Sequence, residues 1–186
     1  MKNKNLIILI NIFVYIFFIK STFSEEFNFK SSEIIFLDNG NTIKGINGLD
    51  LITDGGIRIT GKEFNFDKIK NILNVKGNVI IYDDVNKIIL KSEKFTYLKN
   101  NEIIYTKSKT ITEYNNEYFL DTEELTFDRN NKIIFSKKKV NIKDLNGNIS
   151  SMSKFNLSLV TRLLKGDNLE YLDLTSNKIF IKKAVI

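Results

Sequence analysis

Apolar and polar side chains alternate along most of the chain after residue 25, with the two-residue period of a β-strand. The longest run of this kind covers residues 73–81, and shorter runs cover residues 64–66 and 95–97. Turns rich in Asn, Asp and Lys separate the runs. Because alternation places one apolar row on one face of each strand, the pattern predicts an all-β protein whose strands bury a shared face.

Columns of residues recur at intervals of 30 positions. Asparagines do so at Asn41, Asn71, Asn101 and Asn131. Glutamates do so at Glu33, Glu63, Glu93 and Glu123, where we expect a solvated rim rather than a carboxylate site. A unit of this length, made of short strands, cannot bury its apolar face alone, so neighbouring units must stack. The repeat predicts one domain over residues 25–186, with a helical turn as an alternative over residues 154–166, where the period is mixed.

Residues 1–24 have the organisation of a secretory signal peptide. Lys2 and Lys4 precede an apolar stretch, residues 6–19, and the small residues Thr22 and Ser24 follow at positions −3 and −1 of a cleavage site. An uncleaved membrane anchor is the alternative, although a span needs about 20 apolar residues. Either reading predicts that residues 25–186 lie outside the cytoplasm.

The composition excludes several classes of function. The chain has no His and no Cys, which removes the commonest general base, thiol catalysis and the usual zinc ligands. The formal charge is +6, but Lys2, Lys4 and Lys20 lie in or beside the apolar N-terminal stretch, leaving a net charge of +3. That balance is too small to indicate nucleic-acid binding. We therefore expect a protein that is not an enzyme and has no cofactor and no metal site.

The repeated units resemble the OstA-like lipopolysaccharide-transport family, which contains LptA-like periplasmic domains and the N-terminal domain of the assembly protein LptD. The resemblance rests on the segments VKGNVIIYDD (75–84), SEKFTYLKNNEIIYTK (92–107), TEELTFDRNNKIIFSKKKVNIKD (122–144) and GNTIKG (40–45). It implies a stack of short antiparallel strands folded into an open V-shaped jelly roll, the β-taco. The tail, residues 154–186, resembles the LptD domain more than the LptA-like one. The chain is thus expected to be either a complete bridge protein or an assembly protein without its barrel.

In such a V, the alternating apolar face implies a groove for the acyl chains of lipopolysaccharide. The residues assigned to it are Phe64, Phe66, Val75, Val79, Phe95, Tyr97, Tyr105, Leu125, Phe127 and Phe135. The same residues form an ordinary core if the two sides of the V close on each other, and the pattern alone does not separate groove from core.

Four lysines suggest a site for the headgroup phosphates. Lys107 and Lys137 occupy the same position in successive repeats, as do Lys109 and Lys139, so we expect each pair to stack on neighbouring strands. Stacked like charges are unfavourable unless an anion lies between them or solvent screens them. A plain solvated rim is the alternative.

The resemblance implies a module that passes lipopolysaccharide towards the outer membrane. It places the chain in the periplasm, in association with the outer membrane. The implied partners are lipopolysaccharide, OstA-like proteins that stack on the edge strands (residues 34–37 and 179–181), and the outer-membrane assembly machinery. The alternative is a structural or adhesive β-solenoid without a lipid ligand.

Overall fold

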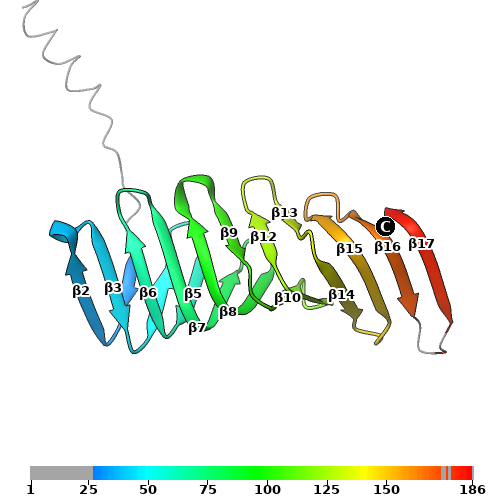
Figure 1. The fold of residues 1–186 in the computed structure, drawn as a ribbon, viewed down its shortest axis with the longest axis horizontal. Coiled ribbons are helices and arrows are strands. Elements are labelled where there is room, and N and C mark those ends of the chain that lie inside the picture. The colour runs from blue at the N-terminus through cyan, green and yellow to red at the C-terminus, as the bar shows by residue number, and fades with distance from the viewer. Residues whose placement is uncertain (1–26, 173–174, 176, 186) are drawn as a thin grey trace, which may run out of the picture.

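The computed structural model describes residues 27–172, 175 and 177–185, and in this part of the chain 17 strands form one sheet. The predicted signal peptide, residues 1–24, lies outside the described residues. No helix in the described part is long and apolar enough to cross a membrane. The strands follow one another along the long axis of the molecule, from β2 at one end to β17 at the other (Figure 1). The predicted all-β antiparallel fold is confirmed.

The strands fall into short ones and five long ones. The short strands of the N-terminal half are β1 (Asn28–Lys30), β2 (Glu33–Leu37), β3 (Thr42–Ile46), β4 (Leu49–Ile52), β5 (Ile57–Gly61) and β6 (Glu63–Asp67). Those of the C-terminal half are β9 (Ile103–Thr106), β10 (Thr110–Tyr114), β11 (Tyr118–Thr122), β12 (Leu125–Asp128), β13 (Ile133–Phe135) and β14 (Lys139–Asp144). The long strands are β7 (Ile72–Asp83), β8 (Ile88–Leu98), β15 (Ile149–Ser158), β16 (Leu164–Leu172) and β17 (Lys178–Val185). Two 3-10 turns, η1 (Asp38–Gly40) and η2 (Lys99–Asn101), complete the elements.

Strand pairing divides the sheet into two walls. The first wall has the order β2–β3–β6–β7–β8–β9–β12–β13–β15, and the second has the order β1–β4–β5–β7–β8–β10–β11–β14–β15. The long strands belong to both walls: residues 72–76 of β7 pair with β6, whereas residues 80–83 pair with β5. The walls therefore meet at a corner, and β16 and β17 extend both of them.

The chain bends at the corner where residues adopt positive φ. Asn47 and Gly48 join β3 to β4 with φ of 61° and 115°, and Gly77 and Asn78 bend β7 with φ of 84° and 50°. Asn and Gly enter this left-handed region at low cost, and a bulge there bends a strand and raises its twist. The two bends fall at equivalent positions of successive repeats, so the corner follows the period of the sequence.

At the tips of the walls, aspartates organise the turns between strands. The Asp67 carboxylate accepts a hydrogen bond from the backbone N–H of Lys70 at 2.9 Å, and Asp128 accepts one from the N–H of Asn131 at the same distance. The Asn148 side chain donates to Asp144, and this bond, with those from nearby backbone N–H groups, holds the pKa of Asp144 below its usual value. These local bonds explain why Asp and Asn mark the turns in the sequence.

The apolar face of both walls points inward, as the alternation predicts. Leu51, Ile57, Leu90, Ile104 and Phe127 are buried to 1% exposure or less. The segment over residues 154–166, for which a helical turn was the alternative, forms the end of β15, a turn and the start of β16. The inward apolar residues therefore belong to strands, and strand pairing provides the hydrogen bonds of their backbone N–H and C=O groups.

Gly45 sits directly opposite Phe64 in the β3–β6 pair, and the Phe64 ring covers the position where a side chain would start. A Cβ atom on Gly45 would lie 1.9 Å from Phe64 Cε1. The Phe64 ring has little room to move, because it is stacked on Phe29 with centroids 4.7 Å apart.

We predict that Gly45→Ala destabilises the protein by about 1–3 kcal/mol through overpacking. Gly40→Ala is the control: it meets no atom within 4 Å and bears only the strain of a positive φ of 85°. The measurement is the free energy of unfolding in urea. A loss no larger for Gly45→Ala than for Gly40→Ala would contradict the proposed packing.

Candidate functional site

Eight of the ten residues assigned to the groove line the inner face between the walls. They are Phe64, Phe66, Val75, Val79, Phe95, Tyr97, Leu125 and Phe127, with exposures between 0% and 7%. Two aromatic residues near the start of the described chain pack on them. Phe27, just before β1, lies edge-on to Phe66 with ring centroids 4.8 Å apart, and Phe29, in β1, stacks on Phe64. In this structure these eight residues form a packed core, and a ligand reaches them only if the walls separate.

Tyr105 and Phe135 lie on the outer face, so their assignment to the inner face is wrong. The β8–β9 register pairs Tyr105 with Thr96 and pairs Ile104 with the inward Tyr97. In the same way Phe135 pairs with the outward Thr126. The inward residues have odd numbers before each of these tip turns and even numbers after it. An alternation pattern read straight through the turn cannot detect this change.

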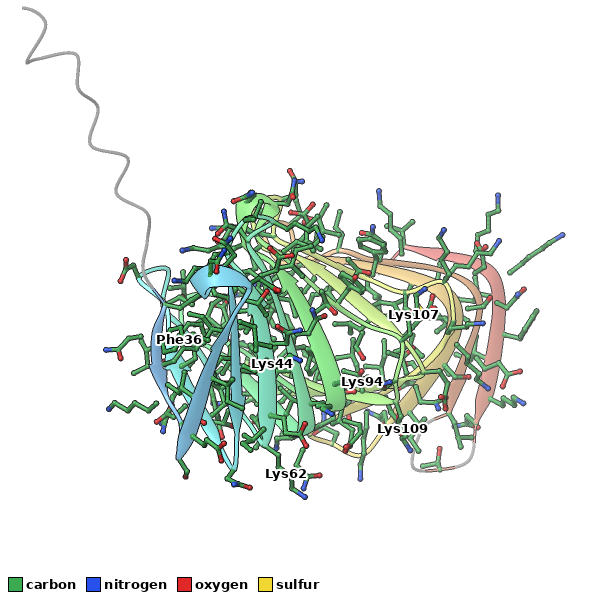
Figure 2. The ribbon with its side chains drawn as sticks, turned by 60° about the vertical axis from the view of Figure 1, so that its left-hand side comes forward. Phe36, Lys44, Lys62, Lys94, Lys107 and Lys109 are labelled. Carbon is green, nitrogen blue, oxygen red and sulfur yellow. The ribbon has the colours of Figure 1, made fainter. Side chains whose placement is uncertain are left out.

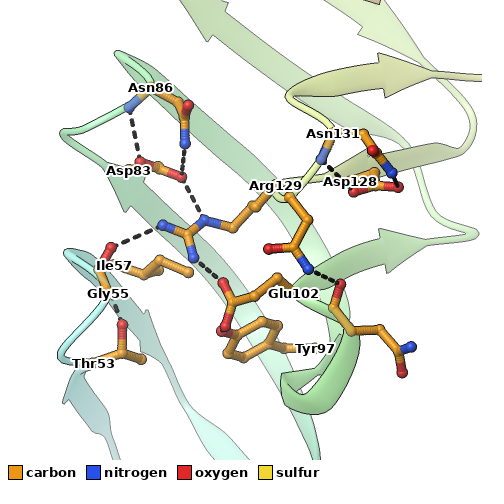
Figure 3. A network of polar contacts seen from close by, with 12 residues as sticks. Thr53, Gly55, Ile57, Asp83, Asn86, Tyr97, Glu102, Asp128, Arg129 and Asn131 are labelled. Atoms are coloured by element: carbon orange, nitrogen blue, oxygen red, sulfur yellow. Dashed lines mark hydrogen bonds and ion pairs between the residues drawn. The ribbon is translucent and has the colours of Figure 1, made fainter.

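Arg129 closes the mouth between the two walls (Figure 3). It lies in the tip turn between β12 and β13 of the first wall, and its Nε donates to Asp83 of the second wall at 2.7 Å. Its Nη2 donates to the carbonyl of Gly55, at another tip of the second wall, at 2.9 Å. Its Nη1 donates to Glu102 on the first wall. We call this set of contacts the Arg129 latch.

Arg129 and Asp83 are buried, and each nitrogen of the guanidinium group makes a hydrogen bond. The Arg129 side chain is 9% exposed and that of Asp83 is 1% exposed. Asp83 also accepts two hydrogen bonds from Asn86, at 2.9 and 2.8 Å, and Glu102 accepts one from the Tyr97 hydroxyl at 2.5 Å. Burial alone lowers the pKa of Arg129. The hydrogen bond and charge of Asp83, together with the charge of Glu102, outweigh this effect, so the pKa of Arg129 lies above its ordinary value. Arg129 therefore stays charged and holds the tips of both walls together.

Beyond the latch, towards the C-terminus, the inner face opens into a cleft of about 190 Å³. Its apolar lining comes from both walls: Tyr114, Tyr118, Leu120, Ile142, Leu157 and Leu164. Tyr118 is 42% exposed, and its ring stacks on Tyr114 with centroids 6.5 Å apart. Arg162, Asn115 and Glu117 complete the lining. We call this feature the mouth cleft.

The mouth cleft could not be recognised from the sequence pattern. Ile142 and Leu157 belong to the alternating apolar face, and that signal was present. These two residues differ from Phe64 and Phe95 in lying on the C-terminal side of the latch. The repeat does not indicate where the latch lies. The positions equivalent to Arg129 carry Asn39, Ile69, Lys99 and Leu159.

Among protein-family models no match was found, and no curated protein matches the chain. Among solved structures, a match is LptH from Pseudomonas aeruginosa, described as the LptA homologous periplasmic component of the conserved lipopolysaccharide transport device. The TM-score is 0.52 at 11% sequence identity, over 67% of this chain and 93% of LptH. The fold is LptA-like. The resemblance stated from the repeated segments is thus confirmed at the level of the fold.

The stacking predicted for the lysine pairs is not found in this LptA-like fold. Each unit adds two strands to each wall, so β12 separates β9 from β13, and β11 separates β10 from β14. Lys107 and Lys137, which follow β9 and β13, are therefore not neighbours. The Lys109 side chain forms an ion pair with Asp121 at 3.2 Å. The backbone N–H of Lys137 donates to the Glu124 carboxylate at 3.3 Å. Carboxylates, rather than a second lysine, accompany these two positions.

We predict that Arg129→Met lowers the free energy of unfolding by about 3–5 kcal/mol, because it leaves the buried Asp83 carboxylate without its cation. Arg58→Met is the matched control. It removes an Arg–Asp pair of similar length, 2.8 Å to Asp50, whose arginine side chain is 54% exposed. We expect that control to stay close to the unchanged chain, since exposed pairs contribute little. Equal losses in chemical denaturation would show that the latch does not hold the walls together.

Proposed function

We propose that this protein is a non-enzymatic periplasmic carrier of lipopolysaccharide, which shields the acyl chains between its two walls on the way to the outer membrane. The observation that carries the proposal is the mouth cleft, an apolar opening of about 190 Å³ that continues the inner face of an LptA-like fold. The predicted signal peptide and the periplasmic origin of LptH support the location.

The mouth cleft has the chemistry of an amphiphile site. Each acyl methylene moved from water against its lining gains roughly 0.8 kcal/mol. The polar end of the lipid then lies at the tips, beside Arg162, whose guanidinium suits a headgroup phosphate. The headgroup site predicted from the four lysines did not include Arg162.

The packed core is the continuation of the mouth cleft towards the N-terminus. Acyl chains reach Phe95, Phe127 and the other inward residues only after the Arg129 latch opens. The proposed route therefore has two parts: an open part at the mouth cleft and a closed part, the packed core. Separation of the walls would join them.

The edges of the sheet provide docking surfaces for partners. In β2 all five residues are exposed, with Phe36 at 63%, and in β17 Phe180 is 62% exposed. Each of these strands pairs with one neighbour, β3 or β16, so its outer backbone edge is unpaired in the described part of the chain. An LptA-like neighbour, or a second copy, can continue the sheet by strand addition. The outer-membrane assembly machinery is the proposed destination, in keeping with the expected likeness of the tail to LptD.

A photocrosslinking pair on β11 tests the carrier function. Tyr118 and Phe119 are adjacent aromatic residues with similar exposure, 42% and 38%, but Tyr118 lines the mouth cleft and Phe119 lies on the outer face. We predict that a photoreactive residue in place of Tyr118 forms adducts with lipopolysaccharide in cells, and that one in place of Phe119 does not. The adducts are detected by immunoblotting for the saccharide.

Labelling at neither position, or equal labelling at both, would contradict the proposed acyl site. The absence of adducts together with preserved folding would favour a structural β-solenoid without a lipid ligand. A third position, Phe95, reports on the latch: it should label only when Arg129→Met is also present, because the Phe95 side chain is 3% exposed in the latched structure.

The docking surfaces give a separate prediction. Phe36→Asp or Phe180→Asp places a charge on an exposed edge strand, so either change should abolish concentration-dependent association in sedimentation velocity. Phe119→Asp is the control, since Phe119 is exposed but lies on an inner strand of the second wall. Association that persists in both edge variants would exclude strand addition at these edges.

A further inference from the structure

A second cleft, of about 700 Å³, lies on the outer face of the first wall, on the opposite side of the sheet from the core. Its lining includes four lysines from different segments, Lys44, Lys76, Lys94 and Lys107, and one acidic residue, Glu63. The net charge of the lining is thus +3. Figure 2 shows Lys44, Lys94 and Lys107 following one another across this face. We call it the basic cleft.

Three of the four lysines of the basic cleft have no ion-pair partner among the described residues. Lys76 forms an ion pair with Glu63 at 2.7 Å, which uses the single carboxylate of the lining. Among the described residues no ion pair is found for Lys44, Lys94 or Lys107. Lys76 and Lys94 are also directly opposite in the β7–β8 register. Like charges at that spacing destabilise a sheet, and a bound anion would remove the cost.

The floor of the basic cleft is a row of hydrogen-bonding side chains in register across neighbouring strands. Asn65 pairs with Asn74, Asn74 with Thr96, and Thr96 with Tyr105. The Thr96 hydroxyl donates to the Asn74 amide oxygen at 2.7 Å, which fixes both side chains. Amide, hydroxyl and phenol groups in a row suit the hydroxyl groups of a sugar, and the half-buried Tyr105 ring offers a face for stacking.

We propose that the basic cleft binds a phosphate-bearing saccharide. Lys94 and Lys107 contact the phosphate groups, Lys44 closes the other side, and the row from Asn65 to Tyr105 contacts the sugar. The volume lies within the range of about 300–1,000 Å³ of ligand sites. The ligand can be the saccharide of lipopolysaccharide, in which case the proposal rests on the proposed function, or a free phosphate ester. It uses no residue of the mouth cleft.

Isothermal titration calorimetry on the full chain tests this proposal with three probes: a deacylated phosphorylated core oligosaccharide of lipopolysaccharide, the same oligosaccharide after phosphatase treatment, and inorganic pyrophosphate. We expect the phosphorylated oligosaccharide to bind, and each of Lys94→Gln and Lys107→Gln to weaken it about tenfold, since each removes a charge-assisted hydrogen bond. Lys143→Gln, an exposed lysine on the second wall, should leave the affinity unchanged.

The probes separate the two sources of phosphate. Loss of binding after phosphatase treatment, with no binding of pyrophosphate, assigns the site to the saccharide phosphate. Pyrophosphate that binds and is weakened by the same two variants assigns the site to phosphate groups in general, with no need for the sugar. Binding that none of the variants alters, an equal loss in Lys143→Gln, or no binding of any probe overturns the proposal.

A failure of this proposal can be distinguished from a failure of the proposed carrier function. Deacylated probes do not report on the mouth cleft, and the Tyr118 crosslink does not report on the basic cleft. A chain that labels lipid at Tyr118 but binds no phosphorylated saccharide would keep the carrier function and lose only this site. The reverse pattern would keep the site and lose the carrier function.

Discussion

The buried contacts of Arg129 link the tips of the two walls across the protein interior. A sheet of short strands folded at a corner has two free rows of tips, and nothing in strand pairing alone holds those tips together. Arg129 supplies that link by bonding to Asp83 and to the Gly55 carbonyl across the mouth, with Glu102 fixing its position on its own wall. A buried ion pair is costly to break, because removing one partner leaves a charge without compensation.

The latch and the mouth cleft lie along one apolar face that is otherwise packed into a single core. On the N-terminal side of the latch, aromatic and aliphatic side chains are packed together, and the Phe29 and Phe64 rings stack with centroids 4.7 Å apart. Beyond it, the same face opens as the mouth cleft, where Tyr118 is exposed. The outer face carries a third, polar feature, the basic cleft. Under the two proposals, the apolar cleft inside takes acyl chains and the cationic cleft outside takes a phosphorylated saccharide.

The alternation of residues was sufficient to predict the fold, because an inward apolar row and polar Asn–Asp turns are local properties of each unit. It placed Phe64, Phe95 and Phe127 on the inner face correctly. It failed at Tyr105 and Phe135, because tip turns change which positions point inward. The lysine stacks failed because equivalent strands of successive repeats are two strands apart within a wall. The latch could not be predicted, since Arg129 interrupts the repeat and meets Asp83 only after folding.

The rate of thiol labelling at inward positions tests most directly whether the latch keeps the core closed. The sequence has no cysteine, so only the introduced thiol is labelled. Leu164 lines the mouth cleft, and Leu90 is fully buried near the latch, with 0% exposure. We predict that Leu164→Cys, which is partly buried but lines the cleft, reacts at a readily measurable rate. Leu90→Cys should react orders of magnitude more slowly, and adding Arg129→Met should accelerate only Leu90→Cys. Similar labelling rates at both positions in the presence of Arg129 would contradict a closed core next to an open cleft.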